Sequence, residues 1–149
     1  MRAVVQRVSG GKVLVENEVL AEIEQGLVVL LGISERDEDR DASYVAEKIA
    51  NLRIFSDEDG LFNFSVRDIG GEVLVISQFT LFGDIRKGRR PSFTEAASPE
   101  KAEIFYKKVL ENLREKKVTT KEGKFQAVME VHIVNQGPVT IIIDSKKNF

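Results

Sequence analysis

GLVVLLGI, at residues 26–33, is a continuous apolar run with no charged residue inside it. A run of this length without polar alternation predicts a strand that is buried on both faces. Residues 73–79, VLVISQF, predict a second core strand. Shorter strands are predicted around these two, at residues 2–8, 12–16, 19–24, 127–134 and 139–143. Strands therefore dominate the predicted fold.

Two helices are predicted between these groups of strands. The first spans residues 39–53, and the acidic residues at its start suit the positive end of a helix. The second begins with a capping hydroxyl at Ser98 and a proline at Pro99, and it runs to about Lys116. The apolar positions recur with helical spacing at Ala42, Val45, Ala46 and Ile49, and at Ala102, Phe105, Tyr106, Val109 and Leu113. We predict one α+β domain over residues 1–149, with curved, barrel-like antiparallel or mixed sheets covered by two main helices.

Composition narrows the possible chemistry. The chain has no cysteine, which excludes disulfides and thiolate catalysis. With one histidine in addition, a zinc site would have to be built from carboxylates alone, which is not a usual set of zinc ligands. His132 falls on the polar face of its predicted strand, and no Ser-His-Asp signature or glycine-rich phosphate loop is present. We therefore expect no metal and no cofactor. Because the chain also has no signal peptide and no apolar stretch long enough to cross a bilayer, we expect a cytoplasmic protein without membrane contact.

Charge is unevenly distributed along the chain. Residues 1–80 hold 8 Lys and Arg against 15 Asp and Glu, whereas residues 81–149 hold 14 against 9. A basic half on an acidic protein favours a local anionic partner. The cations concentrate at Arg86, Lys87, Arg89 and Arg90, close to an aromatic residue, a pattern typical of phosphate contact with nucleic acid. The alternative is a solvated surface loop.

Two further segments are candidates for a functional site. Ser77, Gln78, Phe79 and Thr80 stand where the second core strand ends, a place where polar side chains can line a pocket. Alternatively, they only satisfy backbone groups at a strand end. The pair Gly137 and Pro138 predicts a turn between two strands. Were the bond before the proline cis, the turn would present rigid carbonyls without side chains to a small ligand.

Five motifs taken together resemble the D-aminoacyl-tRNA deacylase family. They stand in the family's order and cover essentially the whole chain. The matching segments are MRAVVQRV at residues 1–8, LRIF at 52–55, SQFTL at 77–81, KGRRPSF at 87–93 and NQGPVT at 135–140. The chain departs from the family pattern at Gln126 and Gln136, which flank the motifs and put details of the adenosine pocket in question rather than the reaction.

The resemblance implies a homodimer that acts on the aminoacylated 3′ end of tRNA as a carboxylic-ester hydrolase. A Gly-cis-Pro segment, here Gly137 and Pro138, would enter the pocket of the partner subunit beside that subunit's residues 77–80. Arg7 would hold this segment in place. Ala102, Phe125 and Met129 would form the pocket for the terminal adenosine of tRNA.

The residues also indicate a mechanism. Thr80 is the obvious protein nucleophile, yet the sequence offers no general base that could activate its hydroxyl. We therefore expect the 2′-hydroxyl of the ribose to assist the attack while N–H groups near Phe79 and Thr80 hold the oxyanion. The carbonyls of Gly137 and Pro138 would exclude L side chains. Because glycine has no side chain to exclude, glycyl-tRNA should also be cleaved. Three alternatives stay open: a non-catalytic RNA-binding module, an interaction protein, and an esterase for small molecules.

Overall fold

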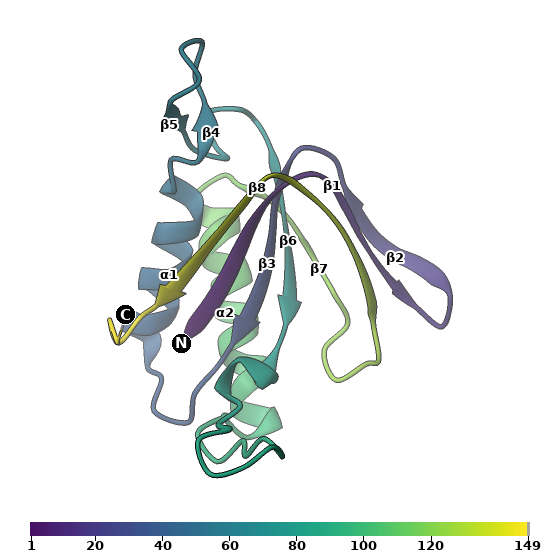
Figure 1. Cartoon of the computed structure of the whole chain (residues 1–149), viewed down its shortest axis with the longest axis vertical. Coiled ribbons are helices and arrows are strands. Elements are labelled where there is room, and N and C mark those ends of the chain that lie inside the picture. The colour runs from purple at the N-terminus through teal and green to yellow at the C-terminus, as the bar shows by residue number, and fades with distance from the viewer. Residues whose placement is uncertain (149) are drawn as a thin grey trace.

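The apolar run at residues 26–33 forms β3 (Gly26–Gly32), the middle strand of a six-stranded mixed sheet. The computed structural model describes residues 1–148 (Figure 1). The order across the sheet is β2-β1-β3-β6-β7, and β8 pairs with β1. The other strands of this sheet are β1 (Arg2–Val15), β2 (Glu18–Ile23), β6 (Glu72–Ser77), β7 (Thr119–Glu122) and β8 (Glu130–Asp144). The sheet curves until it is nearly closed, which confirms the predicted α+β, barrel-like class.

The pairing directions place the strand ends that matter for the site. β1 is antiparallel to β2, β3 and β8, whereas β3, β6 and β7 run parallel to one another. The carboxyl ends of β3 and β6 therefore lie at the same end of the sheet. A small hairpin of β4 (Phe55–Ser56) and β5 (Phe62–Phe64) projects from the opposite end (Figure 1).

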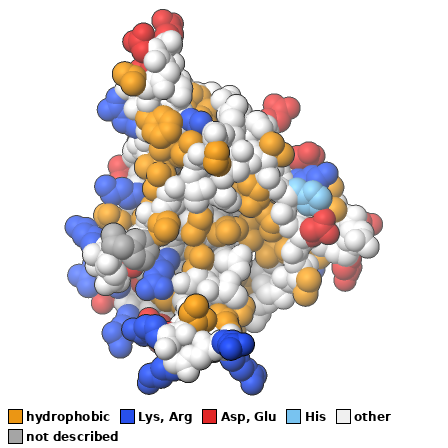
Figure 2. Space-filling view, in the orientation of Figure 1, with side chains coloured by type: hydrophobic (Ala, Val, Ile, Leu, Met, Phe, Trp, Pro, Cys, Tyr) orange, Lys and Arg blue, Asp and Glu red, His pale blue; other side chains and the backbone are white. Residues whose placement is uncertain are grey.

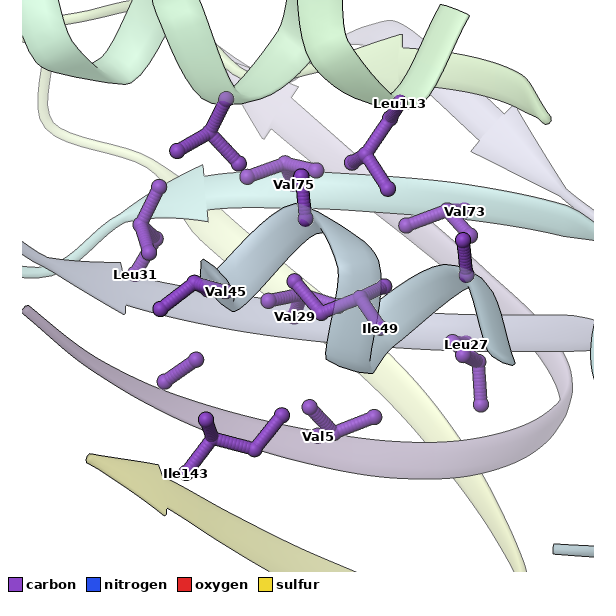
Figure 3. Packing of buried hydrophobic residues seen from close by; sticks show 14 of the residues in the cluster. Val5, Leu27, Val29, Leu31, Val45, Ile49, Val73, Val75, Leu113 and Ile143 are labelled. Atoms are coloured by element: carbon purple, nitrogen blue, oxygen red, sulfur yellow. The ribbon is translucent and has the colours of Figure 1, made fainter. Parts of the chain in front are cut away.

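Both faces of β3 are buried, as its composition predicted. On one face Leu27, Val29 and Leu31 point toward helices α1 (Asp39–Asn51) and α2 (Pro99–Glu115), which cover the sheet (Figure 3). On the other face Val28 belongs to a second cluster, formed where the curled sheet folds over itself. The members of that cluster are Val8, Val13, Ile23, Val28, Leu74 and Ile76. Two apolar layers thus fix the central strands from both sides.

Both helices begin where the sequence predicted. Ser98 Oγ accepts a hydrogen bond from Lys101 N at 3.4 Å, and Pro99 occupies the first helical position of α2. A reciprocal capping box between Glu38 and Asp41 begins α1. Burial of the Asp41 carboxyl would raise its pKa, but hydrogen bonds led by that from Lys146 outweigh burial and lower the pKa to about 2.

Two predicted strand breaks are wrong. Residues 2–8 and 12–15 belong to the single strand β1, which ends at Val15. The strands predicted at residues 127–134 and 139–143 belong to the single strand β8, which begins only at Glu130. The two long strands pair with each other from Arg2 opposite Asp144 to Leu14 opposite Glu130. This pairing continues across the segments that were predicted to interrupt the strands. Local turn signals cannot predict it, because the two paired strands are far apart along the chain. Gly137 and Pro138 therefore form a bulge inside a strand and not a turn between strands.

The second core strand is shorter than predicted. β6 ends at Ser77, and residues Phe79–Phe82 form a short 3-10 helix, η1. β7 was not predicted, because its sequence is polar. It pairs only with β6 and stands at the edge of the sheet. The helices also end at Asn51 and Glu115, slightly before the predicted limits.

Candidate functional site

The segment Ser77 to Thr80 passes from the buried strand β6 into η1. Gln78 N donates to Leu31 O at 2.8 Å, which ties the segment to the end of β3. The side chains of Phe79 and Thr80 are exposed, and Phe79 is 56% accessible. Gln78 Nε2 donates a hydrogen bond to Thr80 Oγ1. The structure thus presents Phe79 and Thr80 on the surface immediately after a core strand.

The chain after η1 folds back onto it. Asp84 and Ser92 form an isolated antiparallel bridge, which returns Phe93 to the turn. The Phe93 ring meets the Phe79 ring edge to face, with centroids 5.0 Å apart and an interplanar angle of 68°. The sequence placed Phe93 beside the basic cluster as an aromatic neighbour but did not predict its contact with Phe79. The two rings are fourteen positions apart along the chain, and a contact over this distance leaves no local pattern in the sequence.

The four basic residues of this loop differ in their partners. Arg86 donates Nε and Nη2 to the two carboxylate oxygens of Asp84, at 2.9 and 2.7 Å. These hydrogen bonds hold the pKa of the Asp84 carboxyl at about 2. Among the described residues, Lys87, Arg89 and Arg90 have no salt bridge. Figure 2 shows Lys and Arg side chains gathered around the tip formed by the segment after η1. Three cations at this tip are therefore available to an external anion.

The second candidate segment is the bulge at Gly137 and Pro138. The peptide bond between them is cis, and Gly137 has a φ of 131°. Asn135 pairs with Val8 and Thr140 with Gln6, so four residues of β8 stand opposite Arg7 alone. Asn135 Oδ1 accepts from Val139 N at 3.0 Å and spans the bulge. Asn135 was quoted only within a motif, although an Asn side chain bonded to nearby backbone is a recognised turn signal.

Arg7 lies beside the bulge and hydrogen-bonds to its backbone. Its Nε donates to Gln136 O at 3.1 Å, and its Nη1 donates to Ile54 O at 2.7 Å. The guanidinium carbon lies 5.4 Å from the centre of the Phe62 ring in the projecting hairpin. A Cβ atom added to Gly137 would stand 2.9 Å from Arg7 Nη2. The space beside Gly137 is therefore too small for a side chain, because the Arg7 guanidinium occupies it.

The two candidate segments do not meet within one chain. Arg7, opposite the bulge, pairs with Leu27, which in turn pairs with Val73 near the start of β6. Ser77 pairs with Leu31, which is level with Ala3. The separation of four positions from Ala3 to Arg7 corresponds to roughly 13 Å along the strands, with three strand spacings between β8 and β6 in addition. The bulge and η1 therefore lie at opposite ends of the sheet (Figure 1).

The three residues assigned to an adenosine pocket lie near the end of β6. Ala102 is on α2 and is 9% accessible. Phe125 packs against Tyr106, one helical turn further along α2, with ring centroids 5.9 Å apart. Met129 packs on the second apolar cluster, which includes Ile76. Gly123 N donates to Val75 O at 3.0 Å and ties the segment that carries Phe125 and Met129 to β6.

The Thr80 hydroxyl has no hydrogen bond to a carboxylate or an imidazole within residues 1–148. His132, the one histidine, is on β8 and is hydrogen-bonded to Glu130. A base that could activate Thr80 is therefore not provided by its neighbours in the chain. In the described part of the chain, no group of three or more acidic or histidine side chains is arranged to hold a metal ion. None of the described helices is long and apolar enough to span a membrane.

Comparison with known proteins identifies relatives along the whole length of the chain. The family model described as D-Tyr-tRNA(Tyr) deacylase matches residues 4–144. The chain is 56% identical to a D-aminoacyl-tRNA deacylase of Thermotoga petrophila over 149 residues, which is 100% of both chains. It is 58% identical to that of Carboxydothermus hydrogenoformans over 144 residues, which is 97% of this chain and 99% of the relative.

Two solved structures have the same fold. One is described as c-Myc DNA Unwinding Element Binding Protein and shares 45% identity, with a TM-score of 0.91 over 97% of this chain and 98% of the other. The second is described as a probable eukaryotic D-amino acid tRNA deacylase, with a TM-score of 0.78 over 95% and 97% of the two chains. At 18% identity the second supports the fold alone.

Proposed function

The chain belongs to the D-Tyr-tRNA(Tyr) deacylase family, and on this premise we propose that it hydrolyses the ester between a D-amino acid and the 3′ end of tRNA. The observation that carries the proposal is the full-length match to this family together with a turn that presents free N–H groups beside Thr80. Phe79 and Thr80 are the first two residues of η1, so their N–H groups have no carbonyl partner inside the turn. Free N–H groups of this kind can stabilise the oxyanion of an ester hydrolysis.

The nucleophile is a water molecule whose attack is assisted by the 2′-hydroxyl of the terminal ribose. The isolation of the Thr80 hydroxyl from any base supports this part of the proposal. Thr80→Ala should then retain most of its activity, and a substrate ending in 2′-deoxyadenosine should react poorly. Near-complete loss of hydrolysis by Thr80→Ala with unchanged tRNA binding would instead make Thr80 the nucleophile.

Selection against L-amino acids is steric and comes from the backbone at Gly137 and Pro138. Two hydrogen bonds hold the backbone that flanks this pair: Arg7 Nε donates to Gln136 O, and Asn135 Oδ1 accepts from Val139 N. A rigid wall of carbonyls can exclude one configuration at the α-carbon while it makes little contact with the other. Glycyl-tRNA has no side chain to exclude and should be cleaved. Hydrolysis of L-aminoacyl-tRNA at a rate similar to that of the D form would contradict this account.

The working pocket is assembled from two copies of the chain. The separation of η1 and the bulge within one chain supports this arrangement, since each end lacks its counterpart. Val134 and Ile142 of β8, on either side of the bulge, are each 59% accessible. Figure 2 shows further hydrophobic side chains over the sheet face that includes β8, β1 and β3. A second copy seated on this face would bury them and bring its η1 to the bulge.

Subunit complementation tests both the activity and the shared pocket. Thr80→Pro removes one proposed oxyanion donor, and Gly137→Ala alters the bulge, so each variant alone should hydrolyse D-tyrosyl-tRNA poorly. When the two variants are mixed and reassembled, half of the dimers are heterodimers with one intact pocket, and about one quarter of wild-type activity should return. Wild-type protein without hydrolysis would exclude the enzyme and favour an RNA-binding module. If the wild type is active but the mixed variants recover no hydrolysis, residues 77–80 and the bulge belong to separate sites.

A further inference from the structure

Arg2 connects the first strand to the turn that carries Phe79 and Thr80. Its Nη1 donates a hydrogen bond to Leu81 O at 3.0 Å, and its guanidinium carbon lies 4.6 Å from the centre of the Phe82 ring. Among residues 1–148, no other side chain outside η1 donates a hydrogen bond to a carbonyl of this turn. The side chain of Arg2 is 29% accessible, so most of it is covered by these contacts.

The turn has few other contacts that could fix it. Its own hydrogen bonds run from Leu81 N to Gln78 O at 3.2 Å and from Gly83 N to Thr80 O at 3.0 Å. Hydrogen bonds of the 3-10 type have poorer geometry than those of an α-helix. Phe79 and Thr80 are exposed and add little packing, whereas Phe82 is 7% accessible and anchors the exit of the turn. Arg2 acts on this exit through both Leu81 and Phe82.

The orientation of the Arg2 side chain favours positioning over simple charge pairing. Its Nε is buried and lies 3.6 Å from Asp144 Oδ2, which is too long for a hydrogen bond. The Asp144 carboxylate already accepts hydrogen bonds from Lys146 N at 2.8 Å and Asn148 Nδ2 at 2.9 Å. The Nε of Arg2 thus has no hydrogen-bond partner, whereas its Nη1 donates to Leu81 O in the turn. An arginine retained only for an ion pair would direct its fork at the carboxylate.

We propose that Arg2 is a positioning residue, which holds η1 so that the Phe79 and Thr80 N–H groups face the reacting ester. This inference rests on the proposed function. Arg2, at the start of β1, and Arg7, near its middle, then have matching roles, because each donates to a main-chain carbonyl of one half of the pocket. Arg2 does not touch the substrate, and its effect passes through the backbone of residues 79–82.

Arg2→Met tests this role, since methionine keeps an apolar chain over Phe82 but removes every donor. For D-tyrosyl-tRNA, kcat per folded protein should fall roughly tenfold while KM changes less than about twofold, as expected when catalytic groups are displaced by a fraction of an ångström. Arg2→Lys should restore part of the rate. Arg36→Met is the matched control, because Arg36 lines the same cavity of about 830 Å³ as Arg2 but, among residues 1–148, has no hydrogen bond or cation–π contact with η1. Its kcat should equal that of the wild type.

Amide hydrogen exchange supplies a readout that does not depend on activity. In Arg2→Met, exchange should accelerate in peptides that cover residues 78–84 and stay unchanged in those that cover residues 134–140. Unchanged exchange at residues 78–84, unchanged kcat, or an equal loss in Arg36→Met would each overturn the role of Arg2. Wild-type protein without hydrolysis would overturn the proposed function instead, and the exchange measurement would still decide whether Arg2 holds the turn.

Discussion

The two ends of the sheet present different chemical groups to a ligand. At the η1 end, exposed side chains and free N–H groups stand on a short turn with few hydrogen bonds of its own. At the bulge end, the backbone of Gly137 and Pro138 is bare and is held by Arg7 and Asn135. Under the proposed function, the η1 end carries the chemistry and the bulge end selects by shape. We therefore expect that the reaction and the selectivity can be altered separately, and the following predictions test this separation.

Gly137→Ala should have the largest effect. The new Cβ would stand 2.8 Å from Val139 Cγ2 and 2.9 Å from Arg7 Nη2, on a backbone with a φ that L residues rarely adopt. We expect D-tyrosyl-tRNA hydrolysis to fall on the order of 100-fold, because a displacement of about 1 Å in a catalytic pocket has effects of that size. Steady-state kinetics of the purified variant measure it.

Gly70→Ala is the matched control for this substitution. Gly70 also has a positive φ, of 63°, but its added Cβ would meet no atom within 4 Å. A loss caused simply by replacing a glycine of positive φ should appear in both variants, whereas the close contacts of the new Cβ are specific to position 137. An equal loss in Gly70→Ala would show that the bulge has no special role.

Arg7→Met should have the next largest effect, and the effect should fall on selectivity. The variant loses the hydrogen bonds to Gln136 O and Ile54 O, so the bulge can move away from the ligand. We expect the ratio of D- to L-tyrosyl-tRNA hydrolysis to drop by roughly tenfold, because one hydrogen bond from a charged group contributes about 1.5 kcal/mol. A fall in both rates with an unchanged ratio would place Arg7 on the side of catalysis and break the comparison.

Phe93→Leu should slow the reaction moderately without a change in selectivity. It removes the edge-to-face contact that covers Phe79 at the η1 end. Because such aromatic pairs contribute about 1 kcal/mol, we expect a loss of about fivefold in kcat/KM for D- and L-substrates alike. The measurement is the same pair of substrates, and a change in the D-to-L ratio is the result that would contradict the separation of the two ends.

Arg90→Ala should have the smallest effect at fixed salt, a decrease of a few-fold in tRNA affinity. Its signature is a salt dependence of binding that becomes shallower by about 0.7 in the logarithmic slope, as expected for one lost phosphate contact on a single strand. Arg86→Ala should change the slope less, because Arg86 is paired with Asp84. Lys48→Ala on α1 is a control for charge alone. Equal slopes for Arg86→Ala and Arg90→Ala would show that the pair with Asp84 does not withhold Arg86 from RNA.

Local patterns predicted much of the fold. The apolar run of β3 indicated burial on both faces, and Ser98 with Pro99 marked the start of α2, since these signals depend on neighbouring residues. The motifs at residues 77–80 and 135–140 were also found in the sequence. Their surroundings were predicted less well. The sequence divided the continuous strand β8 in two, gave Arg2 no role of its own, and did not predict the contact between Phe93 and Phe79.

By itself, the amino-acid sequence determined which segments are buried, where the helices begin, and which short motifs carry the resemblance to a family. Only the tertiary structure decided that Gly137 and Pro138 form a bulge in one long strand, and that this bulge and Thr80 lie at opposite ends of the sheet. It also decided that Arg2 and Arg7 each hold one of these ends. The physical reason is that burial and capping follow from adjacent residues, whereas strand pairing and the partners of a guanidinium depend on residues that are distant along the chain.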